Sequence, residues 1–187
     1  MTSLWTGRRV RLRAIEPGDW SAFMAFDQST TDTRRADQVW PPRSAAAYQR
    51  WAGDKAGQVP TGDAFMVGIE ALKSRELVGS VSTHAVDPRK GSFYYGVSVA
   101  AQHRRKGYAS EAVRLLLAFM FGERRYHKCE ASVFAFNEPS IALHLSMGFV
   151  QEGRLREHEF FAGRRHDVLL FGITAPEFAA RHPFGEV

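Results

Sequence analysis

The sequence contains a single cysteine, Cys129, among its 187 residues. One thiol cannot form an internal disulfide, which argues against a disulfide-stabilised secreted scaffold. Long hydrophobic runs are also missing, because the longest apolar stretch, residues 115–121, is far too short to cross a bilayer. The first residues show no apolar segment of a secretory signal. We therefore expect a cytoplasmic protein with no membrane segment.

Two common nucleotide-binding motifs are absent as well. No Gly-x-x-x-x-Gly-Lys-Ser/Thr pattern is present, which disfavours a P-loop ATPase. No Gly-x-Gly-x-x-Gly follows the first expected strand, which disfavours a Rossmann dinucleotide site. Internal repeats, low-complexity segments and linkers are also lacking. We expect one domain over residues 1–187, with a core at 8–174 and a C-terminal tail at 175–187.

The composition is that of a globular chain with a basic balance. Hydrophobic residues make up 44% and aromatic residues 12%, which is enough for a sizeable core. The net charge of +5 favours acidic ligands such as phosphates. A nucleic-acid-binding module could use the basic clusters at 104–106, 124–128 and 164–166. The aromatic residues have core-like spacing and no RNA-binding motif is present, so nucleic acid is disfavoured as a partner.

The first half of the chain reads as strands and helices in alternation. Alternating apolar and polar residues predict strands, whereas apolar residues at helical spacing predict helices. Residues 28–40 are polar and are expected to form a loop. We expect a strand at 9–15, helices at 17–26 and 44–53 with Ser44 as a cap, and an antiparallel meander of strands at 64–71, 76–84 and 92–99.

The second half begins with a change of period. An apolar helical pattern covers 108–121 and a strand pattern covers 128–134, so strand, helix and strand predict a right-handed crossover with parallel neighbours. A short helix at 139–147 and a hairpin of 149–161 with 166–173 should follow. The expected fold class is mixed α/β (α+β), antiparallel first and parallel in the centre.

The basic turn at residues 104–109 carries the clearest functional signal. It precedes a helix, whose first N–H groups are unpaired and whose dipole is positive at that end. Gly107 lets a ligand approach the backbone closely, because it has no Cβ. Three basic residues precede this glycine. The pattern predicts a diphosphate cradle, and a solvated basic turn is the alternative.

Two motifs of the chain resemble signatures of the GNAT family of N-acetyltransferases. Arg104-x-x-Gly107-x-Ala109 matches the family's Gln/Arg-x-x-Gly-x-Gly/Ala signature. The segment from Asn137 to Gly148-Phe149 is similar to the second signature, an Asn, a short helix and Gly-Phe. The resemblance covers about residues 8–174. It is nearest to the subgroup that acetylates ribosomal-protein N-termini and to its spermidine-acetylating relatives.

The resemblance implies acetyl-CoA as the donor and no metal. It implies that parallel strands at 94–99 and 128–134 splay around acetyl-CoA, with main-chain groups of Val97 and Val99 pairing with the pantetheine arm. The N–H groups of residues 105–109 would hold the pyrophosphate. The implied acetyl-CoA residues are Val97, Val99, Arg104, Arg105, Lys106, Gly107, Tyr108, Ala109, Asn137 and Ser140. For Asn137, helix capping is an equally open reading.

The resemblance also implies direct attack of an amine on the thioester, in a ternary complex. Many relatives carry a Tyr four residues before Gly-Phe that protonates the leaving thiolate, and here His144 stands at that position. His144 is thus the candidate acid, with Ser140 as the second candidate and a packing histidine as the alternative. Relatives often carry a Glu where this chain has Tyr94, a poor base at neutral pH. Water or a carboxylate from elsewhere would have to serve instead. His84 and Asp87, near the end of the preceding strand, are candidates, but an ordinary strand end and turn is the preferred interpretation of both.

The acceptor amine is not named by the sequence. A protein N-terminus, a polyamine and another small amine remain open, as does a catalytically silent acetyl-CoA-binding protein. A homodimer is a further option that the resemblance leaves open. Candidate acceptor residues lie in the early helices and the final hairpin: Phe26, Asp27, Asp32, Trp40, Trp51, Glu157, Glu159 and Phe160.

Overall fold

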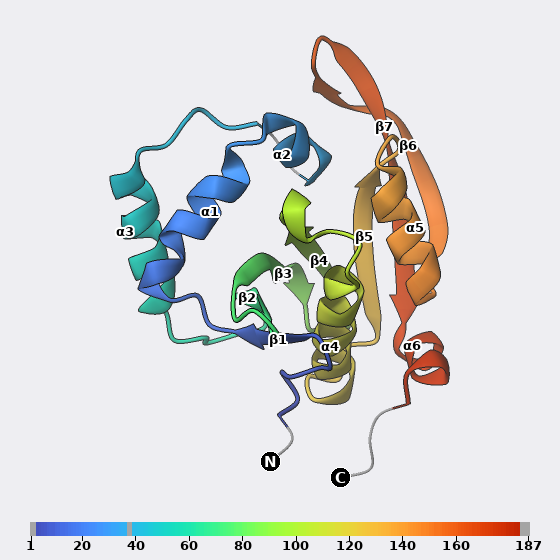
Figure 1. Cartoon of the computed structure of the whole chain (residues 1–187). Helices are drawn as coiled ribbons and strands as arrows, with labels where there is room; N and C mark the ends of the chain where they lie inside the picture. Colours follow the sequence, from blue (N-terminus) through green and yellow to red (C-terminus); the bar gives the residue numbers. More distant parts are fainter. Residues whose placement is uncertain (1–2, 37–38, 184–187) are drawn as a thin grey trace. The chain divides into compact units, whose positions relative to one another are not determined.

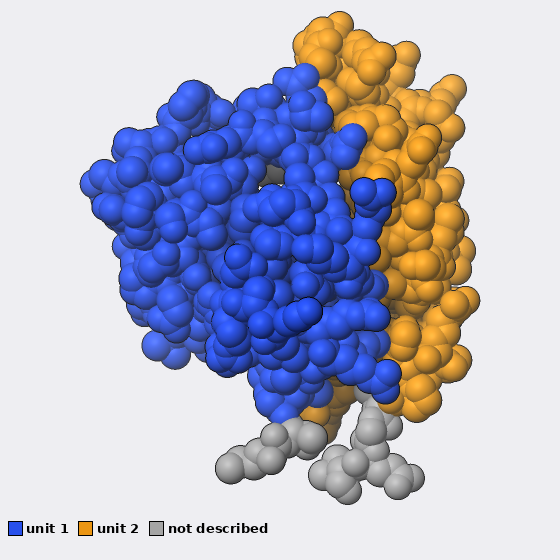
Figure 2. All heavy atoms as spheres, viewed as in Figure 1, with its two compact units in different colours: residues 1–84, 96–116 blue, residues 85–95, 117–187 orange. Residues whose placement is uncertain are grey.

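The computed structural model describes residues 3–36 and 39–183 (Figure 1). The chain forms two compact units, one of residues 1–84 with 96–116 and one of residues 85–95 with 117–187 (Figure 2). The expectation of one domain over residues 1–187 stays a prediction. Within the described ranges no helix is both long and apolar enough to span a membrane.

The first unit holds the N-terminal strands and helices. Its chain passes into the second unit in β3, β4 and α4, each of which has residues in both units. The elements of this half of the chain are β1 (Val10–Arg13), η1 (Pro17–Asp19), α1 (Trp20–Asp27), α2 (Thr30–Ala36), α3 (Ala45–Ala56), β2 (Met66–Ala71), β3 (Leu77–Asp87), β4 (Ser92–Val99), η2 (Ala101–His103) and α4 (Tyr108–Gly122).

The second unit holds the C-terminal elements. The hairpin of β6 and β7 turns at Ala162 and Gly163, which both have positive φ as a tight hairpin turn requires. The elements are β5 (Lys128–Phe134), α5 (Glu138–Met147), β6 (Val150–Phe161), β7 (Arg164–Thr174) and α6 (Ala175–Arg181).

The strands form a seven-stranded mixed sheet in the order β1-β2-β3-β4-β5-β7-β6. Pairs β1–β2 and β2–β3 are antiparallel, as are β5–β7 and β6–β7. The pair β4–β5 is parallel, and its register runs from Ser92↔Lys128 to Tyr94↔Glu130. The predicted fold class, an antiparallel meander followed by parallel central strands, is confirmed.

The prediction of a loop at residues 28–40 is wrong at its centre, where α2 forms. Ser29 begins this helix, because its hydroxyl and its carbonyl both accept the N–H of Asp32. Asp32 lies in the first turn and Arg34 and Arg35 in the last, which suits the helix dipole. All residues of the helix before Ala36 are polar, so the apolar period that predicts helices is absent.

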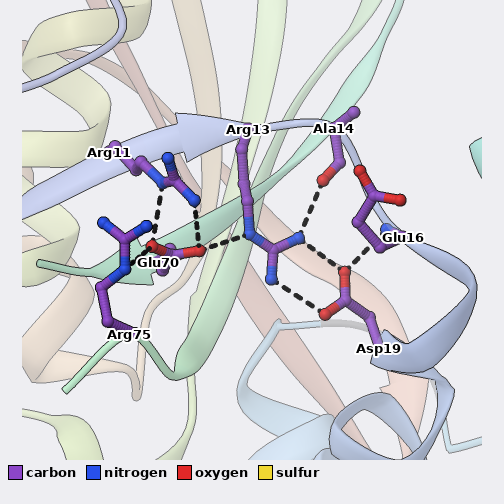
Figure 3. A network of polar contacts seen from close by, with 7 residues as sticks. All are labelled: Arg11, Arg13, Ala14, Glu16, Asp19, Glu70 and Arg75. Atoms are coloured by element: carbon purple, nitrogen blue, oxygen red, sulfur yellow. Dashed lines mark hydrogen bonds and ion pairs between the residues drawn. The ribbon is translucent and has the colours of Figure 1, made fainter.

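A polar network joins β1 to β2 in the first unit (Figure 3). Glu70 on β2 is only 4% exposed, and its carboxylate forms ion pairs with Arg11 and Arg13 of β1 and with Arg75. Arg13 also binds both carboxylate oxygens of Asp19 at 2.7 and 2.9 Å. Burial opposes ionisation of Glu70, but hydrogen bonds from the two β1 arginines outweigh it and lower its pKa. The network thus links β1 to β2 and, through Arg13, to Asp19 of η1.

Candidate functional site

The basic turn at residues 104–109 contains two left-handed residues, and we call it the nest. Arg105 and Gly107 have positive φ values of 59° and 77°, and they alternate with residues of negative φ. Left-handed residues of this kind occur in turns whose successive N–H groups point to one concave surface and bind an anion. The helix α4 begins at Tyr108, directly after the nest. The predicted diphosphate cradle therefore has a suitable backbone.

Side chains of the turn have two different environments. The guanidinium of Arg104 donates to the carbonyl oxygen of Val99 at 3.1 Å and pairs with Asp32 of α2 at 2.5 Å. Arg104 is thus engaged in holding the turn against β4 and α2. Arg105 and Lys106 are exposed and leave their charges on the surface of the turn.

Arg9 lies beside this turn, although it is far away in the sequence. A Cβ built on Gly107 would lie 2.7 Å from a guanidinium nitrogen of Arg9. A side chain at position 107 would therefore meet a cation as well as a strained backbone. Sequence reasoning did not include Arg9, because no local pattern connects it to the turn.

Glu111 explains why Arg9 is held there. This carboxylate, in the first turn of α4, is 8% exposed and accepts the backbone N–H groups of Arg8, Arg9 and Val10 at 2.9, 2.6 and 2.9 Å. Burial opposes its ionisation, but these three hydrogen bonds outweigh burial and lower its pKa. Glu111 therefore ties the start of β1 to the helix that follows the nest.

In the second unit, Asn137 and Ser140 form the start of α5. The Asn137 side-chain oxygen accepts the N–H of Ser140 at 3.3 Å, so Asn137 caps the helix. This confirms the capping interpretation of Asn137, while its contact with acetyl-CoA stays a prediction. Ser140 is half-buried.

His144 on α5 is 4% exposed and bonded at both ring nitrogens. Its Nδ1 lies 2.7 Å from the carbonyl oxygen of Ser140, and its Nε2 lies 2.8 Å from the hydroxyl of Tyr95. A carbonyl can only accept, so Nδ1 carries the hydrogen and Nε2 accepts the Tyr95 hydroxyl hydrogen. The ring also packs against Phe149 and Phe171, at centroid distances of 5.0 and 5.3 Å. Sequence reasoning did not identify Tyr95 as the partner of His144.

Burial lowers the pKa of His144 below its ordinary value of 6.5. The folded state thus favours the neutral ring, and the unfolded state takes up a proton first as the pH falls. We therefore expect the free energy of unfolding to decrease as the pH falls below about 6.5. Urea titrations between pH 7.5 and pH 5.5 should show this slope in the wild type and a smaller one in His144→Gln. Equal slopes in both proteins would contradict the expected buried, neutral histidine.

The two carboxylates that the early helices contribute to the candidate acceptor residues already have partners. Asp27 accepts the Tyr48 hydroxyl at 2.7 Å and pairs with Arg43, and Asp32 pairs with Arg104. Trp51 packs edge-on against Phe23 in the core of the first unit. Trp40 and Phe160 are exposed. Both early carboxylates are therefore occupied by neighbouring side chains.

Cys129 lies in the core, fully buried on β5. Burial raises the pKa of its thiol well above the ordinary value, which suppresses the reactive thiolate. This agrees with the expectation that Cys129 is a core residue.

Comparison with protein families identifies one domain type. Residues 9–150 match the model of the acetyltransferase (GNAT) domain. An uncharacterised N-acetyltransferase from the SPbeta prophage of Bacillus subtilis is 35% identical over 178 residues, which cover 95% of this chain and 97% of the relative. The spermidine N(1)-acetyltransferase of Vibrio cholerae is 30% identical over 180 residues, which cover 92% and 97%.

Solved structures share the fold. A crystal structure of a probable acetyltransferase has a TM-score of 0.80 at 22% identity, covering 91% of this chain and 96% of that one. The Vibrio cholerae spermidine N-acetyltransferase, solved in complex with CoA and spermine, has a TM-score of 0.78 at 21% identity, covering 92% and 99%.

Proposed function

The chain belongs to the GNAT family of acetyltransferases, and we propose that it transfers the acetyl group of acetyl-CoA to a primary amine by direct attack in a ternary complex. The chain is thus an acetyl-CoA-dependent N-acyltransferase. The proposed acceptor class includes a protein N-terminus, a polyamine and other small amines. The observation that supports donor binding best is the left-handed nest at Arg105 and Gly107, directly before α4.

The proposed donor residues divide by the part of acetyl-CoA that they would hold. The N–H groups of residues 105–109 would bind the pyrophosphate, and Arg9 would add a positive charge beside Gly107. Main-chain groups of Val97 and Val99 would pair with the pantetheine arm. Asn137 and Ser140 would contribute from the start of α5. Arg104 supports the turn through Asp32 and Val99.

The departing thiolate needs a proton or a positive environment. We propose that His144 supplies this from α5 together with Tyr95, with Ser140 as the second candidate. In the neutral pair the hydrogen between the two rings belongs to the Tyr95 hydroxyl. Nε2 carries no hydrogen in the neutral ring, so His144 can give a proton through this nitrogen only after Nε2 has taken one up.

His144→Ala should lower the turnover number by about 100-fold, the usual size of a lost acid catalyst, and leave the acetyl-CoA dissociation constant almost unchanged. Tyr95→Phe should also lower turnover, because it removes the hydroxyl that donates a hydrogen bond to Nε2 of His144. Rates and affinities are to be measured only on samples with a cooperative thermal transition. Undiminished turnover in folded His144→Ala would remove His144 from the mechanism.

Calorimetric titration with acetyl-CoA, free CoA and ATP tests the proposed donor. Binding of acetyl-CoA and CoA but not ATP is expected, because recognition should need the pantetheine arm as well as the phosphates. Amine acceptors can then be screened by release of the free CoA thiol. A folded sample that binds none of the three ligands would overturn the proposal.

We also propose that the chain self-associates as a homodimer. Strand β6 lies at the edge of the sheet and exposes Val150, Leu155 and Phe160. Edge strands with apolar side chains favour pairing with another chain. Light scattering on the purified protein should give the mass of two chains, and a monomer at all concentrations would contradict this.

A further inference from the structure

An open hollow of about 770 Å³ lies in the second unit, where β4 and β5 begin. It is lined by the turn between β3 and β4 and by the first residues of the two parallel strands. Its polar lining is Asp87, Lys90, Ser92, Tyr94, Lys128 and Glu130, and His127 also contributes. None of these residues belongs to the nest or to the Tyr95–His144 pair.

Most charges around this hollow neutralise one another. Lys90 pairs with Asp87 at 3.4 Å, and Lys128 pairs with Glu152 at 2.8 Å. Asp87 also accepts the backbone N–H groups of Arg89 and Lys90, at 3.0 Å each. These carboxylates are therefore committed to the turn and to the neighbouring lysines.

Glu130 is the exception in the lining. Within residues 3–36 and 39–183, no group forms an ion pair or a hydrogen bond with its carboxylate, although the charge of the neighbouring Lys128 acts on it. The pKa of Tyr94 is raised, first by burial and then by the negative charge of Glu130. The Tyr94 phenol therefore stays protonated beside the Glu130 carboxylate. The hollow thus contains a half-buried carboxylate that can accept a proton or bind a cation.

The position of Glu130 in the sheet is equally specific. The parallel pairing of β4 and β5 ends at Tyr94↔Glu130, although β5 continues to Phe134. Residues opposite each other in a sheet project from the same face, so the phenol and the carboxylate share one face at the last paired position. Val97 and Val99, the residues proposed to pair with the pantetheine arm, follow three and five residues after Tyr94 on β4.

We propose that this hollow receives the acceptor amine and that the Glu130 carboxylate takes up the proton that the amine loses. The inference rests on the proposed acetyl transfer. In that reaction the amine nitrogen attacks the thioester carbonyl carbon, a C–N bond forms and the C–S bond breaks. One proton leaves the nitrogen for the Glu130 carboxylate. The sulfur departs with its electron pair and takes up one proton, from the acid proposed on α5 or from water, to give the free CoA thiol, and Glu130 then returns its proton to the solvent. The products are an amide and CoA.

The lining supports Glu130 over its neighbours for this role. Tyr94 holds its proton too firmly, and Asp87 is already bonded to the turn. His127 is exposed at the rim, and it is the rival base that the experiment has to separate. The negative charge of Glu130 would also hold a cationic amine in the hollow before it loses a proton.

The first measurement is amine binding, which needs no turnover. Spermidine, n-butylamine and a short peptide with a free N-terminus are titrated into isotope-labelled protein while the side-chain resonances of Tyr94 and His127 are followed. At least one amine should shift both resonances in the wild type. The shift should disappear in Glu130→Gln and persist in Glu123→Gln, a matched change of an exposed carboxylate. No shift with any of the three amines in the wild type would overturn the proposed hollow.

The second measurement separates this inference from the proposed function. Thiol release and acetyl-CoA affinity are compared for the wild type, Glu130→Gln, Glu130→Asp, His127→Gln and Glu123→Gln. Glu130→Gln should lower the turnover number about 100-fold or more at unchanged acetyl-CoA affinity, with partial recovery in Glu130→Asp and little change in Glu123→Gln. His127→Gln should lower turnover clearly less than Glu130→Gln does, because His127 lines the hollow without taking the proton. Full turnover in Glu130→Gln, or an equal loss in His127→Gln, would overturn the role of Glu130. If the wild type itself does not bind acetyl-CoA, the proposed function is refuted, and this inference is refuted with it.

Discussion

Replacing Gly107 with glutamate is expected to weaken acetyl-CoA binding by more than 100-fold. Gly107 has a φ of 77°, which residues other than glycine rarely adopt. The Cβ of a glutamate at this position would lie 2.7 Å from a guanidinium nitrogen of Arg9. The new carboxylate would also place a negative charge in the nest where the pyrophosphate is proposed to bind. A 100-fold change corresponds to about 2.7 kcal/mol of binding free energy. Calorimetric titration with acetyl-CoA measures it directly.

Gly163→Glu is the matched control for this prediction. Gly163 has a φ of 76°, almost the same as that of Gly107, but no atom lies within 4 Å of its ideal Cβ. It occupies the tip of the β6–β7 hairpin. Both variants therefore carry the same backbone strain and the same added charge, and only one carries them in the nest. Equal acetyl-CoA affinities in folded samples of the two would contradict the proposed pyrophosphate site.

Glu111→Gln should destabilise the protein by about 3 kcal/mol at pH 7. The carboxylate accepts three backbone N–H groups in a buried position, and hydrogen bonds to a charged group are worth about 1.5–3 kcal/mol each. A glutamine has only one accepting oxygen, and its NH₂ group would face donors. Urea unfolding of the wild type and the variant measures the difference, with Glu123→Gln as an exposed control just beyond α4.

The same pair of proteins gives a pH test with a definite sign. The pKa of Glu111 is lowered in the folded state from an ordinary value of 4.5. Its stabilisation is therefore fully present above about pH 4.5 and is lost as the pH falls through the lower folded value. The stability difference between wild type and Glu111→Gln should shrink across this range. A constant difference down to the acid limit would contradict an ionised, hydrogen-bonded Glu111.

Loss of Glu111 should also weaken acetyl-CoA binding without touching the nest itself. The carboxylate holds the backbone of Arg9, whose side chain lies beside Gly107. The affinity of Glu111→Gln should therefore fall less than that of Gly107→Glu, because only the position of one cation changes.

The sequence predicted most of the secondary structure, since periodicity is a local property. The strands at 92–99 and 128–134 agree with β4 and β5 residue for residue, and Ser44 and Asn137 cap their helices as expected. The exception is α2, whose polar residues have no apolar stripe and whose start depends on Ser29. Capping and charge placement form this helix, and neither produces a periodic pattern.

The sequence by itself also determined the family and the place of the nest, because the residues of each motif are consecutive and the glycine is required where φ is positive. Only the tertiary structure decided which distant groups meet. It placed Arg9 beside Gly107 and the N–H groups of residues 8–10 beside the Glu111 carboxylate. It also placed the Tyr95 hydroxyl beside His144, and Glu130 opposite Tyr94. The physical reason is that hydrogen bonds and charge interactions act over a few ångströms in space, whatever the separation in the chain. Strand register and helix packing bring these partners together, and no local pattern records them.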